Sequence, residues 1–525
     1  MSLIKALKVL ENTVETVLKL GPLYKPSLVK TFFPRLDWIE RYDPQYVEDV
    51  EESFRNVREY VDKYVVPNAI EYHKKAEEDR YFYDKDPKYW ELMKTGGLLR
   101  RGKEDYYQML GLWPELFGGP GLGAMATTFA AIDEMSAGCA GFSVAFNDHW
   151  LGLLPIILTA RYDIIYDILA EERNGEIAYV AYAITDTTGG SDAEDADFYN
   201  MAKEFSLDVE KVEGGYVLNG TRQFTSNGYI AKYITVLGHL DHKRPDETSC
   251  FFFVPTDSEG FSCGRNEEKM GQRFYPTTVT NFDHVFVPDE YLLGPVGTGF
   301  YTGGTVTLAA SRAGVAAIGT GIARGVYERF LEYARETEIN GHKLIDENDI
   351  QMALGTWQRE IHMARQGYMD SCGLLDSVFI GILEPLKLIP ESMNSMIREV
   401  LFDPVVQPIL SSILHKIMGS NACKGLIDKV WYDYVMPEDM VERLLGYSSS
   451  AKPFAGDMAV RIATEALNLM GPRYSTYRQG IEKLLCDAKL NQIYEGTNQV
   501  NTIASYKMLC TKQPGRHDTS EVVLK

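Results

Sequence analysis

Tyr179-Val180-Ala181-Tyr182-Ala183-Ile184 is a short β-rich run, and the turn Thr185-Asp186-Thr187-Thr188-Gly189-Gly190-Ser191-Asp192 follows it at once. From this point the pattern of the 525-residue chain changes. Further short β-rich runs follow at close spacing, separated by Gly, Asn and Asp; they are 216–218, 233–237 and 251–254. Several short strands at this spacing predict a small antiparallel barrel or sandwich.

Helical periodicity flanks this β-rich region on both sides. Apolar residues recur at helical spacing from about Gln45 to Glu172, with a turn-rich interruption at 111–121, and again from Gly299-Phe300 nearly to the end. This order predicts an α+β fold. The expected units are an N-terminal helical domain (45–176), a middle β-barrel or sandwich domain (177–296) and a C-terminal helical bundle (297–512).

Two terminal segments lie outside these units. In residues 1–44, apolar residues between Leu3 and Leu18 recur at helical spacing with charged residues between them, which predicts an amphipathic helix ending at Gly21-Pro22. The tail 513–525 has the composition of a loose terminus.

The composition limits the classes of function. With 53 basic and 74 acidic residues the net charge is -21, so no basic field is available to hold nucleic acid. An anionic substrate must then be held by a local basic patch. The seven cysteines are scattered and never spaced as CxxC, and the histidines form no HExxH motif, so neither disulfides nor a metal site is expected. No signal peptide or membrane-spanning run is visible, and a cytoplasmic protein is expected.

Near the carboxyl end, the octet Gln492-Ile493-Tyr494-Glu495-Gly496-Thr497-Asn498-Gln499 places a carboxylate between an aromatic residue and a glycine. Alone, a Glu beside Gly is typical of a solvated turn. The turn at 185–192, taken alone, is typical of a hairpin, although its hydroxyl and backbone N–H groups suit a planar or anionic ligand.

Two more stretches add to this pattern. In 218–228, Asn-Gly pairs at both ends are hairpin signals, and alternation along a strand places Phe224 and Ser226 on one face. The stretch 269–273 and the runs from Val285 to Phe300 are typical of loop and strand edge.

These four stretches, in this order, resemble the acyl-CoA dehydrogenase family over roughly residues 45–510. The resemblance implies an FAD enzyme in which Glu495 removes the proton alpha to a thioester carbonyl. Some branches of the family place the catalytic Glu at the position of Ser311. Because this chain has no acid there, we expect Glu495 to be the base.

The resemblance also assigns a flavin pocket. Thr185 would contact the pyrimidine end of the isoalloxazine, and Gly190 and Ser191 would contact cofactor or substrate. Phe224 would flank the flavin ring, and the Ser226 hydroxyl would bond near its N5. The other positions assigned to FAD are Tyr182, Ile184, Arg335, Asn348, Asn468, Gly471, Thr497 and Gln499; those assigned to the substrate are Ser191, Arg312, Tyr494 and Gly496.

The chain departs from the family pattern at several positions. Asp186-Thr187-Thr188 replaces Glu-Pro-Gly in the flavin turn. The family arginine that binds the FAD pyrophosphate of a neighbouring subunit falls on Thr337, so we expect Arg335 or Arg473 to replace it, because a diphosphate in so acidic a protein needs a cation. Asn348 stands where a glutamine usually helps to hold the adenine half.

An apolar stretch from about Gly373 to Tyr447 is longer than the family's bundle usually has. Prolines at 385, 390, 404 and 408 divide it, so it cannot span a bilayer. One interpretation is a set of extra helices packed on the bundle or on another subunit. The other is a docking surface for a redox partner or a membrane face, because so large an apolar area needs a cover.

The resemblance implies dehydrogenation of an acyl-CoA to the 2-enoyl-CoA, with electrons passed to an electron-transfer flavoprotein, by a homodimer or homotetramer. Two alternatives stay open: an acyl-CoA oxidase that uses oxygen, and a non-catalytic flavin-binding homologue. Straight, branched, cyclic and dicarboxylic acyl groups all satisfy the motifs.

Overall fold

The structure is a computed structural model that describes residues 40–41, 44–96, 98–101, 104–107, 124–174, 176–190, 205–383, 396–397 and 399–511. The chain divides into two compact units, 1–52 and 53–525. Of the first unit, residues 40–41 and the start of α4 (Pro44–Tyr60) are described. The amphipathic helix expected between Leu3 and Leu18 lies outside the described residues.

The second unit begins with helices, as the periodicity predicts. They are a π-turn (Val61–Val65), α5 (Val66–Glu78), a 3-10 turn (Phe82–Asp84), α6 (Pro87–Gly96), α7 (Ala124–Leu158) and α8 (Tyr162–Arg173). The prediction of an all-helical region is wrong at one place, because β1 (Leu98–Arg101) and β2 (Glu104–Tyr107) pair antiparallel. In these two strands, similar residues stand next to each other, as in Leu98-Leu99 and Arg100-Arg101. Such pairs do not follow the 3.6-residue spacing of an amphipathic helix.

The middle region is a sandwich of two four-stranded sheets in the described residues. One sheet has the order β10-β7-β6-β3 and the other β4-β5-β9-β8. The strands are β3 (Val180–Ala183), β4 (Leu207–Val212), β5 (Gly215–Ser226), β6 (Tyr233–His239), β7 (Ser249–Pro255), β8 (Phe261–Asn266), β9 (Thr277–Pro288) and β10 (Leu292–Leu293). The predicted α+β class is confirmed, with one correction: β3 pairs with β6 in parallel.

Close packing of α7 against β3 positions one side of the site. A Cβ at Gly152 on α7 would come within 2.3 Å of the Val180 carbonyl oxygen, so glycine allows this approach. Thr235 on β6 donates from Oγ1 to the Gly152 carbonyl at 3.1 Å, which joins the helix to the sheet. The residues after β3 therefore lie beside α7.

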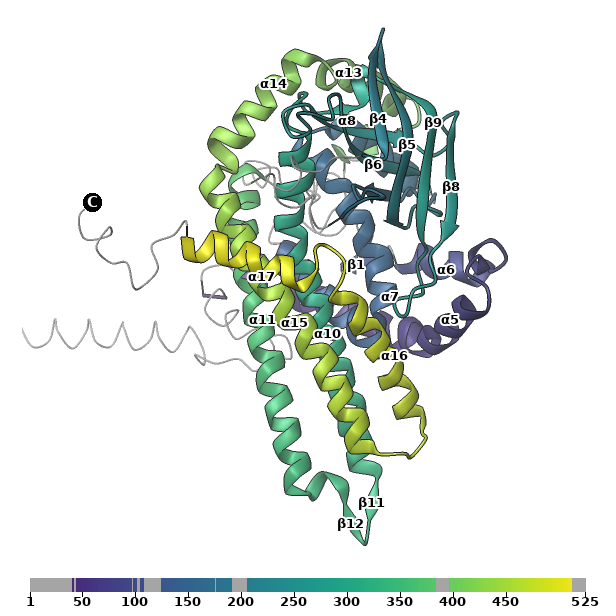
Figure 1. The fold of residues 1–525 in the computed structure, drawn as a ribbon, viewed down its shortest axis with the longest axis vertical. Coiled ribbons are helices and arrows are strands. Elements are labelled where there is room, and N and C mark those ends of the chain that lie inside the picture. The colour runs from purple at the N-terminus through teal and green to yellow at the C-terminus, as the bar shows by residue number, and fades with distance from the viewer. Residues whose placement is uncertain are drawn as a thin grey trace, which may run out of the picture. The chain divides into compact units, whose positions relative to one another are not determined.

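The C-terminal region is a helical bundle in which α10, α11, α15 and α16 run side by side, with α17 crossing them (Figure 1). A π-turn (Phe300–Val306) leads into α10 (Thr307–Glu336), and α11 (Asn348–Leu383) returns along it. The remaining elements are β11 (Glu338–Ile339), β12 (His342–Lys343), a 3-10 turn (Leu344–Asp346), α15 (Glu438–Met470), α16 (Thr476–Asn491), α17 (Asn498–Tyr506) and a π-turn (Lys507–Thr511).

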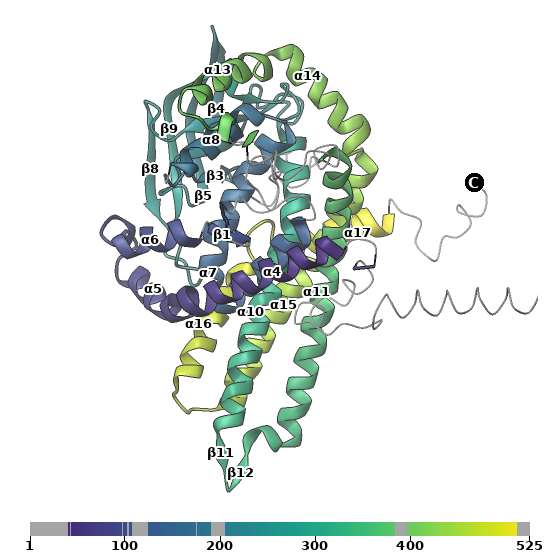
Figure 2. The same ribbon diagram turned by 180° about the vertical axis from the view of Figure 1, so that it is seen from behind.

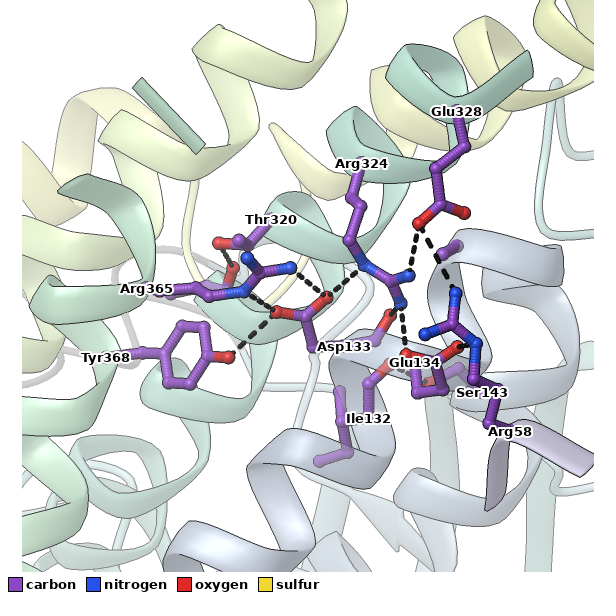
Figure 3. A network of polar contacts seen from close by, with 12 residues as sticks. Arg58, Ile132, Asp133, Glu134, Ser143, Thr320, Arg324, Glu328, Arg365 and Tyr368 are labelled. Carbon is purple, nitrogen blue, oxygen red and sulfur yellow. Dashed lines mark hydrogen bonds and ion pairs between the residues drawn. The ribbon is translucent and has the colours of Figure 1, made fainter. Parts of the chain in front are cut away.

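A buried polar network joins α7, α10 and α11 (Figure 3). Asp133 on α7 accepts hydrogen bonds from Arg324 Nε at 3.1 Å, Arg365 Nε at 2.7 Å and the Tyr368 hydroxyl at 2.8 Å. Arg324 also pairs with Glu134 at 2.7 Å. Although burial opposes ionisation, the two guanidinium groups lower the pKa of Asp133 below its ordinary value. The carboxylate therefore stays charged and holds three helices in register.

The helix Phe300–Glu336 is long and apolar enough to cross a membrane by length and composition alone. Its most apolar window is completely buried inside the fold, so it is the core helix of the bundle.

The predicted insertion contains α13 (Val406–Met418), α14 (Asn421–Val430) and a π-turn (Trp431–Val435). One interpretation of this segment was packing on the bundle or on another subunit; within this chain α13 packs against α8 of the N-terminal helical region (Figure 2), a contact that neither interpretation named. His415 lies between Asp163 at 2.9 Å and Asp167 at 2.7 Å, and Lys424 donates to the Asp289 carbonyl at 2.7 Å. The other side of α13 leaves apolar side chains exposed, namely Val405, Ile409, Ile413 and Ile417.

Candidate active site

A cavity of about 500 Å³ lies where the middle region meets the two helical regions. Its walls come from α7, the turn after β3, the end of β5, α10 and the loop between α16 and α17. Ten of the residues assigned from the sequence line it: Tyr182, Ile184, Thr185, Gly190, Phe224, Ser226, Tyr494, Glu495, Gly496 and Thr497. Stretches about 300 residues apart in the sequence therefore meet in one cavity.

Glu495 lies on the loop between α16 and α17 in a left-handed conformation, with φ of +51°, followed by Gly496 at +76°. Such a φ is uncommon for a residue with a side chain and persists where the surroundings enforce it. Here Asn501 on α17 donates from Nδ2 to the carbonyl oxygens of Glu495, Gly496 and Thr497 at 3.0–3.1 Å. Thr497 also caps α17, accepting from the Val500 N–H at 3.3 Å.

A buried lysine fixes the same loop from α15. Lys452 donates from Nζ to the Gly496 carbonyl at 2.6 Å and to Asn498 Oδ1 at 2.9 Å. Neither Lys452 nor Asn501 was singled out from the sequence. The Lys452 contacts join elements that are distant in the chain, and the Asn501 contacts depend on the bend of the loop. The Asn498 that directly follows the Gly-Thr pair was a visible turn signal, but Asn501, four residues after Thr497, carried none.

The Glu495 carboxylate is held by Ser311, the position at which an acid was looked for in the sequence and not found. Ser311 on α10 donates from Oγ to Glu495 Oε2 at 2.7 Å. Both residues line the cavity. At the position where the resemblance implied a carboxylate in some branches, this chain therefore has a hydroxyl that donates to the Glu495 carboxylate.

Tyr494, next to Glu495, is anchored by its hydroxyl. Gln272 Nε2 and Asn491 Nδ2 each donate to it at 3.3 Å. Burial raises the pKa of the Tyr494 hydroxyl well above its ordinary value, so the side chain is neutral.

The turn after β3 is closed by Asp186, the first residue of the stretch that departs from the family pattern. Its carboxylate accepts from the Ser206 N–H at 3.0 Å and pairs with Arg222, and its own N–H donates to the Gly189 carbonyl at 3.0 Å. Arg222 is buried and also donates to the Leu237 carbonyl. Although burial opposes ionisation, Arg222 and Ser206 lower the pKa of Asp186, which keeps it charged. Asp186 therefore fixes the loop without the proline of the family pattern.

Phe224 and Ser226 both line the cavity, but simple alternation does not place them there. The pairing of β5 with β9 shifts between Arg222 and Thr225, and Phe224 has a φ of +52°. A bulge of this kind re-aims a side chain at a functional site. The Asn219-Gly220 pair also lies inside β5, where the register shifts, and does not form the hairpin we expected.

Several assigned residues lie away from the cavity. Arg312 is buried and donates from Nη1 to Ser449 Oγ at 2.8 Å. Ser191 lies outside the described residues. The remaining positions assigned to FAD, including those expected at its adenine and pyrophosphate, are on the surface and do not line the cavity: Arg335, Asn348, Asn468, Arg473 and Gln499 are exposed, and Gly471 is half-buried.

The cavity residues fit a flat, hydrogen-bonding ring system. Phe224 lines the cavity and is 56% exposed, so an aromatic surface is available for packing. The hydroxyls of Thr185 and Ser226 line the same wall. A Cβ at Gly190 would come within 3.1 Å of Thr185 Cγ2, so a side chain there would crowd the turn. These groups suit the isoalloxazine of FAD. Among the described residues no cluster of side chains suits a metal ion.

Comparison with known proteins extends this picture. The family model for the acyl-CoA dehydrogenase middle domain matches residues 181–285, and that for the C-terminal domain matches 297–377 and 436–508. The C-terminal match is interrupted over 378–435, inside the segment interpreted as an insertion.

Curated relatives match most of the chain. The cyclohex-1-ene-1-carbonyl-CoA dehydrogenase of Syntrophus aciditrophicus is 26% identical over 402 residues, 76% of this chain and 78% of its own length. The cyclohexane-1-carbonyl-CoA dehydrogenase of Geobacter metallireducens is 26% identical over 396 residues, 75% of this chain and 83% of its own length. In fold, the chain is similar to butyryl-CoA dehydrogenase from Megasphaera elsdenii, with a TM-score of 0.63 at 20% identity, covering 87% of this chain and 97% of that one.

Proposed function

The chain belongs to the acyl-CoA dehydrogenase family of oxidoreductases acting on CH–CH groups, and from this membership we propose that it dehydrogenates an acyl-CoA with Glu495 as the base. The observation that carries the proposal is the Glu495 carboxylate, which lines the cavity and accepts a 2.7 Å hydrogen bond from Ser311.

In this proposal Glu495 takes the α proton of the thioester, and the Ser311 hydroxyl orients the carboxylate for that transfer. An α C–H is too weak an acid for an unassisted carboxylate. The Glu495 backbone N–H, held by the contacts of Asn501 and Lys452 to the loop, is therefore proposed to donate to the thioester carbonyl, where negative charge develops. FAD, when bound, supplies the acceptor for the β hydride. Thr185, Gly190, Phe224 and Ser226 would hold its ring.

The proposed electron acceptor is an electron-transfer flavoprotein, and the alternative is oxygen. Substrate-reduced enzyme mixed with air distinguishes the two, because reoxidation on the timescale of turnover favours the oxidase. We propose alicyclic acyl groups as substrates. The names of the curated relatives from Syntrophus aciditrophicus and Geobacter metallireducens, at 26% identity, support this choice.

The test is an anaerobic titration of the purified holoenzyme with a panel of acyl-CoAs, following bleaching of the flavin. In Glu495→Gln, which keeps size and polarity but cannot take the proton, FAD should stay bound while the rate of bleaching falls by several orders of magnitude. Gln499→Glu, which returns an acid to an exposed position of the same segment, is the matched control and should not restore bleaching in the Glu495→Gln background. Near-normal bleaching by Glu495→Gln would mean that the base lies elsewhere.

A further inference from the structure

Gly314 lies on α10 three residues after Ser311, which holds the Glu495 carboxylate, and both positions line the cavity. Residues three apart on a helix lie on the same face, roughly 4.5 Å apart along the axis. The proposed reaction brings the α carbon of the substrate to Glu495, so the carbons bonded to it lie close to this part of α10. Gly314 is therefore placed to decide which acyl groups fit.

The packing of the fold does not require a glycine at position 314. Gly321 and Gly325 of the same helix are required, because a Cβ at either would come within 2.2 Å of a carbonyl oxygen of α7. A Cβ at Gly314 would lie 3.6 Å from Phe129 Cε1 and 3.7 Å from Ile132 Cδ1, which are ordinary van der Waals contacts. Alanine would thus fit at position 314, and it would also stabilise the helix.

What the glycine provides is room. Without a Cβ at Gly314, the cavity wall between α10 and the α7 side chains Phe129 and Ile132 has a recess about as large as one methyl group. Other apolar side chains of these two helices line the same cavity, namely Val144, Leu151, Leu308, Val315 and Ile318. None of the described residues that line the cavity is Lys, Arg or His, so a second carboxylate on the acyl group would have no counter-ion there. The recess suits a hydrocarbon group.

Straight and cyclic acyl groups differ in how much room they need beside the base. The α carbon of a straight chain carries one further carbon, whereas that of a cyclohexane-1-carbonyl group carries two. One of these carbons gives up the hydride and must face the flavin ring, whose proposed contacts Thr185, Phe224 and Ser226 come from the turn after β3 and from β5. The second carbon cannot occupy the same place, and the recess at Gly314 offers it room.

We propose that Gly314 is a specificity-determining residue, whose missing side chain makes room for the second carbon on the α carbon and so for a carbocyclic ring. The inference rests on the proposed function and names the residue that selects the alicyclic class. Alanine would fill this room without displacing Phe129 or Ile132. Gly314→Ala should therefore fold and bind FAD and yet lose the preference for rings.

The test measures kcat/KM of the holoenzyme for two pairs of acyl-CoAs. Cyclohexane-1-carbonyl-CoA is compared with hexanoyl-CoA, and 2-methylbutanoyl-CoA with butanoyl-CoA; in each pair the first member has two carbons on its α carbon. The wild type should favour cyclohexane-1-carbonyl-CoA over hexanoyl-CoA. Gly314→Ala should lower the ratio within each pair about tenfold or more, because one methyl group in an apolar pocket has effects of this size. The values for the two straight chains should change little.

Two further variants sharpen the test. Ile132→Val removes Cδ1, an atom that a Cβ at position 314 would touch, and should restore part of both ratios in the Gly314→Ala background. Gly355→Ala on α11 is the matched control, because Gly355 is an exposed helical glycine whose Cβ would meet no atom within 4 Å. It should leave the ratios unchanged.

If Gly314→Ala does not fold, Ile132→Val alone carries the test. It widens the same space and should raise kcat/KM for cycloheptane-1-carbonyl-CoA relative to cyclohexane-1-carbonyl-CoA, and the absence of such a rise would overturn the inference.

Ratios that Gly314→Ala leaves unchanged, or an equal loss for both members of a pair, overturn the inference. So does a wild type that reacts with straight chains in preference to rings. In each of these cases the flavin is still bleached by an acyl-CoA, so the proposed function stands. If no acyl-CoA bleaches the flavin of the wild type, the proposed function itself fails.

Discussion

Ser311 is the residue through which α10 acts on the proposed base. A hydrogen bond to a charged group contributes about 1.5–3 kcal/mol, and this one also fixes the direction of the carboxylate. Ser311→Ala should therefore lower the rate of flavin reduction about tenfold or more, while the FAD content stays unchanged. Ser311→Thr keeps the hydroxyl and should restore most of the rate. Stopped-flow reduction measures both, and an unchanged rate in Ser311→Ala would mean that this contact does not position the base.

The ionisation of Asp148 is expected to make the stability of the fold depend on pH. The folded pKa of about 8 lies above the ordinary value of 3.8, so the stability that this raised pKa contributes is fully present below pH 4 and is lost as pH rises toward 8. Asp148→Asn removes this loss, because the amide does not ionise. The melting temperature of the variant should exceed that of the wild type by a margin that grows from pH 5 to pH 8 and then stays constant. A margin independent of pH would contradict a buried, protonated Asp148.

At the scale of elements, the turn after β3 depends on one ion pair. Asp186 joins the turn to the buried Arg222 of β5 and to the Ser206 backbone N–H, and the residues of this turn line the cavity. Asp186→Ala should leave Arg222 without its carboxylate and loosen the turn. The dissociation constant of FAD should rise about tenfold or more, as measured by flavin release on dilution. Glu210→Ala, at an exposed position of β4 that does not line the cavity, is the control and should behave as wild type.

At the scale of the whole molecule, the insertion joins the C-terminal region to α8 through His415. Burial lowers the pKa of His415, but hydrogen bonds to Asp163 and Asp167 outweigh this and raise it to about 9. A raised pKa means that this contact stabilises fully below about pH 6.5 and is lost as pH rises through 9. Amide hydrogen exchange in α13, corrected for its intrinsic pH dependence, should therefore accelerate between pH 7 and pH 9.5. His415→Gln should abolish that pH dependence; exchange in α10 serves as the internal control. That the exposed side of α13 meets a redox partner or a membrane stays a prediction.

Much of this organisation could be predicted from the sequence. Periodicity gave the order helical, β, helical, and the resemblance brought together residues as distant as Thr185 and Glu495. Contacts that depend on tertiary approach could not be predicted. The bulge beside Phe224 depends on pairing with β9, and the Lys452 and Ser311 contacts join helices that are separate in the chain.

The proposed base can function only when the helical bundle is assembled, because the bundle holds the backbone of Glu495. Its left-handed bend is held by Asn501 of α17 and by Lys452 of α15, and its carboxylate by Ser311 of α10. An isolated chain rarely adopts this bend, so a partly folded enzyme would carry the glutamate without a functioning base. Loss of proton abstraction should precede loss of helix content on mild denaturation, and the rate of α-proton exchange into solvent would then report on the packing of three helices.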